Sequence, residues 1–257
     1  MAEEINGYKV VRVVGNGATS KVYEVVEQSS HRHFAMKILV PEKAGDRVQR
    51  AALFHEAEVG IALRHQNVIQ IVSVSKDKAK PHFIMEFFPA GSLGLRLKKK
   101  EFDFVRQNLP GILKQAATGL AYMNASGWVH RDIKPDNFLV SAGGDVKIID
   151  FAISAKVGGN GFLAKLLGMK TPVQGTRSYM SPEQIRGEPL DGRADVYSFG
   201  ATCFELVANR PPFRGASNQE LLQKNLHEKA TSPQIHNPDV SDEFAKLILR
   251  MLAKKKE

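Results

Sequence analysis

Residues 130–137 read His-Arg-Asp-Ile-Lys-Pro-Asp-Asn, and this stretch decides how the rest of the chain is interpreted. Downstream follow Asp150-Phe151, Gly175-Thr176 and Ser181-Pro182-Glu183, in that order. Any one of these short pieces can occur by chance. Their joint occurrence at these separations is not expected by chance, and it indicates one set of motifs that serves one function.

The composition predicts a single folded unit. With 257 residues, of which 43% are hydrophobic, the chain can bury a large core. No apolar run approaches the roughly 20 residues that a membrane span needs. The start, Met1-Ala2-Glu3-Glu4, lacks the basic and then apolar pattern of a secretion signal. The one cysteine, Cys203, cannot form an internal disulfide, so we expect a cytoplasmic location.

The net charge of +9 could suggest nucleic acid or anionic lipid as a partner. However, the basic residues are scattered apart from the runs at 98–100 and 254–256, and no basic stretch is interleaved with aromatic residues. Such runs are typical of solvated faces or tails. We therefore expect no nucleic-acid partner.

The first third of the chain has the pattern of a sheet with one helix. Apolar runs rich in β-branched residues predict strands, and an alanine- and glutamate-rich stretch without proline predicts a helix. The predicted strands are Tyr8–Val14, Lys21–Val26, His33–Val40, Ile69–Val74 and His82–Phe88, and the predicted helix is Arg47–Leu63. Together they predict a five-stranded sheet.

After Pro89-Ala90-Gly91 the pattern becomes helical. One apolar stripe recurs at the helical period, formed by Leu109, Ile112, Leu113, Ala116, Leu120 and Met123. Further helices are predicted over Arg193–Ala208, which is apolar nearly all round, Asn218–His227 and Ser241–Ala253. The predicted fold class is α+β, with a small β-rich lobe joined to a larger helical lobe near Glu86–Phe88.

The motifs resemble those of the eukaryotic-type protein kinases, and the resemblance covers nearly the whole chain. It implies a bilobal protein-kinase fold over residues 6–257, with an N-lobe at 6–86 and a C-lobe at 87–257. In the family, an arginine-bearing segment and a last helix follow the point where this chain stops. We therefore expect the C-terminal end of the domain to be incomplete.

The resemblance also implies a reaction, the transfer of the γ-phosphoryl group of ATP, with Mg²⁺, to a protein hydroxyl. Lys134 and the Gly175-Thr176 pair resemble the residues found in the serine/threonine branch, and the motif sequences are similar to those of bacterial members. The implied partner is a protein with a Ser or Thr acceptor, which allows self-phosphorylation in trans. Two alternatives are a pseudokinase, which binds ATP or nothing and signals by shape, and a small-molecule kinase of the same fold.

The nucleotide site is expected on the first two strands and at the hinge. Taken alone, the turn between the strands could be an ordinary hairpin, but its pattern resembles the family's glycine-rich loop with Ser20 in place of the third glycine. The residues expected to cover the phosphates are Gly15, Asn16, Gly17, Ala18, Thr19 and Ser20. Those expected around the adenine are Val22, Ala35, Met85, Glu86, Phe88 and Leu139.

The resemblance assigns catalytic and metal-binding roles. Asp132 is the expected base, and Lys134 is expected to stabilise charge on the transferred phosphate. Asn137 and Asp150 are expected to hold the metal ions through oxygen atoms. Lys37, which could otherwise be a snorkelling surface lysine, is expected to bind the α- and β-phosphates.

The partner expected for Lys37 is a glutamate of the following helix. Glu56 and Glu58 are the two candidates, and they point in different directions around the helix. The distance from Glu56 to the helix end at 65–68 resembles that in the family, so Glu56 is preferred.

Two departures from the family pattern suggest an active arrangement that is easily disassembled. Ala152 follows Asp150-Phe151 where glycine is usual, which would cost about 1–2 kcal/mol if the position needs a positive φ. Gly60 stands where the family usually has a larger apolar residue in contact with Phe151. Leucine at position 60 is therefore expected to favour the active arrangement.

A switch is expected in the segment from Asp150 to Glu183. Arg131 resembles the family's arginine that receives an activating phosphate, and Thr171 is the one hydroxyl residue between Ala155 and Gly175. Its spacing to Thr176 is similar to that of family phosphosites. Phosphorylation would add about −2 of charge and three acceptor oxygens. The alternative is an ordinary exposed threonine.

Overall fold

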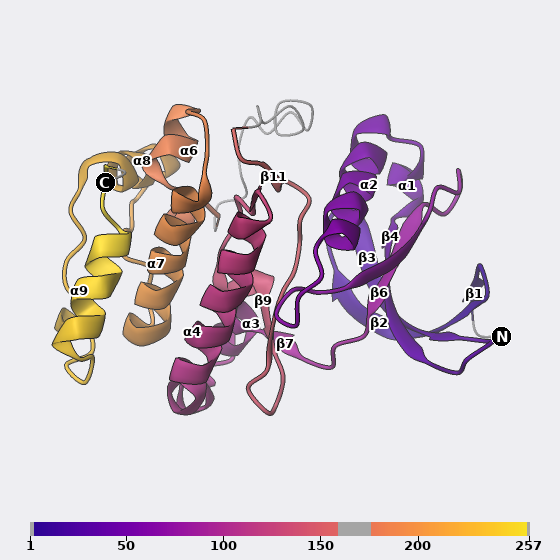
Figure 1. Ribbon diagram of the computed structural model, residues 1–257, viewed down its shortest axis with the longest axis horizontal. Helices are drawn as coiled ribbons and strands as arrows, with labels where there is room; N and C mark the ends of the chain where they lie inside the picture. The colour runs from indigo at the N-terminus through magenta and orange to yellow at the C-terminus, as the bar shows by residue number, and fades with distance from the viewer. Residues whose placement is uncertain (1–2, 159–175, 256–257) are drawn as a thin grey trace.

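The computed structural model describes residues 3–158 and 176–255. Its N-terminal part is an antiparallel six-stranded sheet of order β1-β2-β3-β4-β6-β5 (Figure 1). The strands are β1 (Glu4–Ile5), β2 (Tyr8–Asn16), β3 (Ser20–Glu27), β4 (His33–Leu39), β5 (Ile71–Ser75) and β6 (His82–Glu86). The five predicted strands are confirmed. The sequence missed β1, because a two-residue strand has no periodicity to detect.

Two helices lie between β4 and β5. They are α1 (Pro41–Ala44), which was not predicted, and α2 (Arg47–Ala62), which was. Asp46 starts α2 as its N-cap, since its Oδ1 accepts from the backbone N–H groups of Val48 and Gln49 at 2.9 and 3.2 Å. Leu53, Ala57 and Val59 are buried, and α2 lies against the sheet (Figure 1).

The C-terminal part is helical, as predicted. Its helices are α3 (Leu93–Lys98), α4 (Phe102–Ala125), α6 (Pro182–Arg186), α7 (Gly192–Ala208), α8 (Asn218–His227) and α9 (Asp242–Met251). Its short strands are β7 (Gly91–Ser92), β8 (Trp128–Val129), β9 (Phe138–Val140), β10 (Val146–Ile148) and β11 (Ala155–Lys156). Three 3₁₀ turns are η1 (Pro135–Asn137), η2 (Thr176–Tyr179) and η3 (Pro233–Ile235).

Burial follows the predicted stripes. The α4 residues Ile112, Ala116 and Met123 are at most 1% exposed, and α7 is buried on most sides, as its apolar sequence predicts. α4 begins at Phe102, earlier than the apolar stripe indicates, and contains Pro110. No helix in the described part of the chain has the length and apolar character that crossing a bilayer requires.

The sheet part and the helical part are joined by backbone bonds close to the site. Ile69 N–H donates to Ile148 O at 2.9 Å, and Ile148 N–H donates to Asn67 O at 2.8 Å. The Asn67 side chain adds a bond of 3.1 Å to Val146 O. These bonds fix β10, and the Asp150 that follows it, against the end of the α2–β5 connection.

Candidate active site

Asp195 of α7 holds the loop 130–137 in place by accepting hydrogen bonds from its backbone. This carboxylate is 1% exposed and accepts from the backbone N–H groups of His130 and Arg131 at 2.8 and 2.9 Å. The His130 ring accepts from Asp132 N–H at 3.2 Å through Nδ1 and donates through Nε2 to Ile149 O at 3.0 Å. Burial lowers the pKa of His130, which agrees with a neutral ring that holds Asp132 and the end of β10 together.

Asp132 has two carboxylate oxygens in different situations. Its Oδ2 accepts from Lys134 Nζ at 2.6 Å and from Asn137 Nδ2 at 3.1 Å. Its Oδ1 is buried and has no hydrogen-bond partner among the residues that the structure describes. Burial raises the pKa of Asp132 even though Lys134 opposes the shift. Such a carboxylate has one oxygen fixed by two donors and one oxygen whose capacity to accept a hydrogen bond is unused among the described residues.

Lys37 of β4 meets Glu56 of α2. Lys37 Nζ lies 2.8 and 2.6 Å from the two Glu56 oxygens, whereas Glu58 is exposed on the same helix. Burial would lower the pKa of Lys37, but the charges of Glu56 and Asp150 hold it above its usual value. Burial raises the pKa of Glu56 to about 7. The structure therefore brings together the pair that the sequence preferred.

Asp150 lies next to this pair, with its Oδ1 3.9 Å from Lys37 Nζ. Burial alone would raise the pKa of Asp150, but the charge of Lys37 and further positive neighbours keep it below its usual value. Asn137 Nδ2 donates to Asp132 O at 2.7 Å, so the amide is held by its nitrogen, and its oxygen is the atom that could bind a cation. An ionised carboxylate and an amide oxygen are a donor set that fits a hard divalent cation.

The turn between β2 and β3 exposes its backbone. Gly17 N–H donates to Ser20 O at 2.9 Å and closes the hairpin, while Asn16, Gly17 and Ala18 are exposed. Thr19 O accepts from Val40 N–H at 3.0 Å, which ties the turn to the end of β4. A Cβ at Gly15 would lie 3.3 Å from the Cβ of Val22, so glycine allows the two strands to approach closely.

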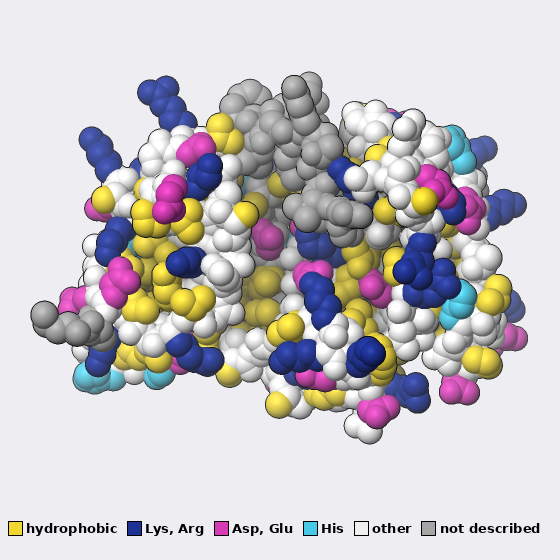
Figure 2. All heavy atoms as spheres, turned by 180° about the vertical axis from the view of Figure 1, so that it is seen from behind, with side chains coloured by type: hydrophobic (Ala, Val, Ile, Leu, Met, Phe, Trp, Pro, Cys, Tyr) yellow, Lys and Arg dark blue, Asp and Glu magenta, His cyan; other side chains and the backbone are white. Residues whose placement is uncertain are grey.

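Most of the residues predicted around the adenine lie on paired strands. Val22 is opposite Lys37 in the register of β3 and β4, and Ala35 is opposite Met85 in that of β4 and β6. Leu139 lies on β9 of the separate small sheet. Figure 2 shows the surface hollowed between the sheet part and the helical part, with hydrophobic and charged side chains on its walls.

The hinge residue Glu86 is bonded within the fold. Glu86 N–H donates to Gln70 O at 2.9 Å, so it is already used within the fold. The Glu86 side chain accepts from Gln70 N–H at 2.8 Å and from Lys147 Nζ at 2.7 Å. Phe88 is partly buried and packs against the core. That backbone groups of Glu86 and Phe88 bind the adenine stays a sequence-based prediction.

Residues 8–257 match the family model described as "Protein kinase domain". The chain belongs to this family. It is 30% identical to a probable serine/threonine-protein kinase of Streptomyces coelicolor over 96% of this chain and 37% of the relative. It is 31% identical to Aurora kinase A-B of Xenopus laevis, over 96% of this chain and 58% of the relative. It is 28% identical to serine/threonine-protein kinase PknB of Mycobacterium tuberculosis, over 97% and 40%.

The chain therefore spans between about two fifths and three fifths of the length of these relatives. The match over nearly the whole chain confirms the predicted family and fold class.

For this kinase domain, the condition stated for Ala152 is not met, and the expectation for Gly60 is wrong. Ala152 does not have a positive φ; the left-handed residues here are Asp150, at 70°, and Arg131, at 71°. The strain expected at alanine is therefore absent. Gly60 has no room for a larger side chain, because a Cβ there would lie 2.4 Å from Cδ1 and 2.6 Å from Cγ1 of Ile71. Ile71 fills the space that we expected a leucine to fill.

The structure describes only part of the predicted switch. Thr171 lies outside the described residues, and Thr176 begins η2. The backbone of Arg131 is bonded to α6, since its O accepts from Gln184 Nε2 at 2.7 Å. Burial lowers the pKa of Arg131. A phosphate on Thr171 therefore stays a sequence-based prediction.

Sequence reasoning missed the contribution of Gln184. Besides its bond to Arg131 O, the Gln184 side chain accepts from Ser181 N–H at 3.0 Å, while Ser181 Oγ accepts from Gln184 N–H at 3.3 Å. This is a capping box at the start of α6. The three-residue spacing of Ser181 and Gln184 is a signal that could have predicted the cap, although not the contact with the loop.

Proposed function

We propose that this chain is an active serine/threonine protein kinase, with Asp132 as the base that accepts the proton of the substrate hydroxyl. The observation that carries the proposal is the asymmetry of the Asp132 carboxylate. Oδ2 is fixed by Lys134 and Asn137, and Oδ1 lacks a partner among the described residues. A general base needs an oriented carboxylate with one oxygen available, and burial raises its pKa, which increases its basicity.

The residues for ATP and Mg²⁺ belong to the same proposal. The exposed turn 15–20 would cover the phosphates with backbone N–H groups, and Lys37, held by Glu56, would place its ammonium on the α- and β-phosphates. Asn137 and Asp150 would hold the metal. When bound, Mg·ATP supplies the electrophilic γ-phosphoryl group and neutralises the charge that develops on its oxygens.

The chain's own part in the transfer is orientation and one proton movement. The substrate hydroxyl would donate to Asp132 Oδ1 while its oxygen attacks phosphorus, and the bond from phosphorus to the ADP oxygen breaks. Lys134 Nζ lies 2.6 Å from Asp132 Oδ2, beside the proposed base, and its positive charge would stabilise the transferred group. The acceptor is a Ser or Thr of a protein, which includes a second copy of the kinase in trans.

The competing function is a pseudokinase that binds nucleotide without transfer. Four groups argue against it, namely Lys37, Asp132, Asn137 and Asp150, because all are present and interlinked. The division into an N-lobe at 6–86 and a C-lobe at 87–257, and the cytoplasmic location, remain parts of the proposal that rest on sequence.

The test compares two substitutions in one loop. Asp132→Asn should lower turnover about 10²–10⁴-fold with labelled ATP, Mg²⁺ and a generic basic protein. Asp136→Asn is the matched control, since its side chain is 45% exposed and pairs with Lys98 at 3.2 Å, away from Asp132 Oδ1. If Asp132→Asn keeps the turnover of the wild type, the assignment of the base is wrong.

A further inference from the structure

Helix α2 makes a second polar contact besides the Lys37–Glu56 pair. His55 Nε2 lies 2.7 Å from Ser154 O, and the two residues are 99 positions apart in the chain. A carbonyl oxygen can only accept, so His55 Nε2 must carry the hydrogen of this bond. The contact therefore joins α2 to the segment that follows Asp150.

His55 and Glu56 hold the helix in two directions. Consecutive residues of an α-helix are about 100° apart around its axis. Glu56 reaches Lys37 on β4, and His55 reaches Ser154. Farther toward the N-terminus of α2, Arg50 donates to carbonyl oxygens of residues 76–78 at 3.1–3.3 Å, which fastens that end to the sheet part. A loss of the His55 bond would leave α2 attached mainly to the sheet part and able to rotate.

Ser154 passes the contact on to the loop that contains Asp132. Its side chain is buried, and its Oγ donates to His130 O at 3.2 Å. Its N–H donates to Phe151 O at 3.1 Å, and the Phe151 ring packs edge-on against the His130 ring at 5.8 Å between centroids. His130 in turn accepts from Asp132 N–H. A continuous set of bonds therefore runs from α2 to the proposed base.

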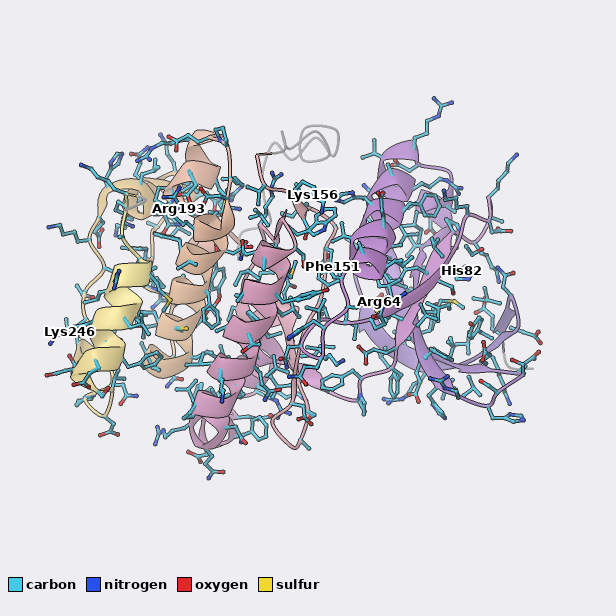
Figure 3. All side chains as sticks on the ribbon, viewed as in Figure 1. Arg64, His82, Phe151, Lys156, Arg193 and Lys246 are labelled. Carbon is cyan, nitrogen blue, oxygen red and sulfur yellow. The ribbon has the colours of Figure 1, made fainter. Side chains whose placement is uncertain are left out.

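The surroundings of His55 set the direction of its ring. The Trp128 ring lies 6.4 Å from it at 60°, and Lys156 Nζ lies 4.3 Å from the centre of the Trp128 ring. Lys156 also donates to Ser126 O at 3.2 Å, and it is opposite Trp128 in the register of β11 and β8. Figure 3 shows Phe151 and Lys156 along one stretch of chain between α4 and α2. Packing thus presents the imidazole to Ser154 in a defined orientation.

We propose that His55 is a positioning residue that couples the placement of α2, and with it the Lys37–Glu56 pair, to the loop carrying Asp132. The proposal rests on the proposed kinase function for its effect on turnover, but the coupling itself is a property of the fold. One intramolecular hydrogen bond of ordinary strength corresponds to about a 2- to 12-fold change in an equilibrium constant. The population of the assembled arrangement should change by this factor when the bond is removed.

Two substitutions separate the hydrogen bond from the packing. His55→Leu removes the donor and keeps apolar volume, whereas His55→Gln keeps an N–H donor that can reach Ser154 O. Glu58→Leu is the matched control, because Glu58 is exposed on the same helix. In each variant, amide hydrogen exchange is followed in segments 47–62 and 150–158 without nucleotide, and kcat/KM is measured with Mg·ATP.

The expected result is faster exchange in both segments of His55→Leu, by about 2- to 12-fold, with kcat/KM lowered by a similar factor. His55→Gln and Glu58→Leu should behave like the wild type. Ser154→Ala by itself should also lower kcat/KM. In a double-mutant cycle, the variant that carries both Ser154→Ala and His55→Leu should lose little more activity than the more impaired single variant.

Three outcomes would overturn the coupling: exchange in His55→Leu equal to that of the wild type, equal impairment of the Gln and Leu variants, or effects that simply multiply in the double variant. A fourth result concerns the proposed kinase function alone. If exchange differs between the wild type and His55→Leu as expected, but the wild type transfers no phosphate, the kinase function is overturned and the coupling is not.

Discussion

Replacement of Gly60 by alanine tests how tightly α2 is packed on the sheet. Gly60 is buried in α2, and a Cβ there would lie 2.4 Å from Ile71 Cδ1, well inside any contact distance. Ile71 is itself 2% exposed, so it has little room to move. Overpacking of this kind costs about 1–3 kcal/mol, whereas alanine gains about 1 kcal/mol in helix propensity. The net change expected for Gly60→Ala is a destabilisation of about 0–2 kcal/mol.

Gly111 supplies a matched control. It also lies inside a helix, α4, but a Cβ there would meet nothing within 4 Å. Gly111→Ala should therefore stabilise the protein by about 1 kcal/mol. The two variants should differ by about 1–3 kcal/mol, which corresponds to about 2–12 °C in Tm for a protein of this size.

The assay is thermal and urea unfolding of both variants, together with Gly60→Ala in an Ile71→Ala background. Ile71→Ala removes the two atoms that block the Cβ, so the second substitution should be neutral or stabilising there. If Gly60→Ala is as stabilising as Gly111→Ala, the packing argument is refuted. Kinase activity of Gly60→Leu should fall, because a leucine must displace Ile71 and with it α2.

Three further predictions concern the site. ATP should raise Tm more with Mg²⁺ than with a chelator, since Asp150 and Asn137 can hold phosphates only through the metal; equal shifts would favour a pseudokinase. Burial raises the pKa of Glu56 to about 7, so activity should fall between about pH 8 and pH 6 as its carboxylate is protonated and releases Lys37; an unchanged acid limb in Glu56→Gln would contradict this. Asp195→Ala should lower both Tm and turnover, because it leaves two buried N–H groups without an acceptor, at a cost of about 1–3 kcal/mol each. An unchanged Tm would contradict the proposal that Asp195 holds the loop 130–137 in place.

Local patterns of apolar residues in the sequence predicted much of the architecture. The apolar runs from Tyr8 to Glu86 predicted five strands, and the stripe around Ile112 and Met123 predicted a long helix, because burial of one face imposes a period on the sequence. β1 and α1 were missed because they are too short to show a period. The early start of α4 was missed because the apolar stripe that indicated the helix begins only at Leu109.

The site divides in the same way. The sequence by itself determined which chemical groups the site contains, namely Lys37, Asp132, Asn137 and Asp150, because the motifs identify these residues by their type and by their position along the chain. The sequence also preferred Glu56 to Glu58 as the partner of Lys37. Only the tertiary structure decided two further contacts between elements, that of His55 with Ser154 and that of Ile71 with the space beside Gly60. The physical reason is that such contacts depend on how α2 is rotated against the sheet and the loop, and no local period specifies that rotation.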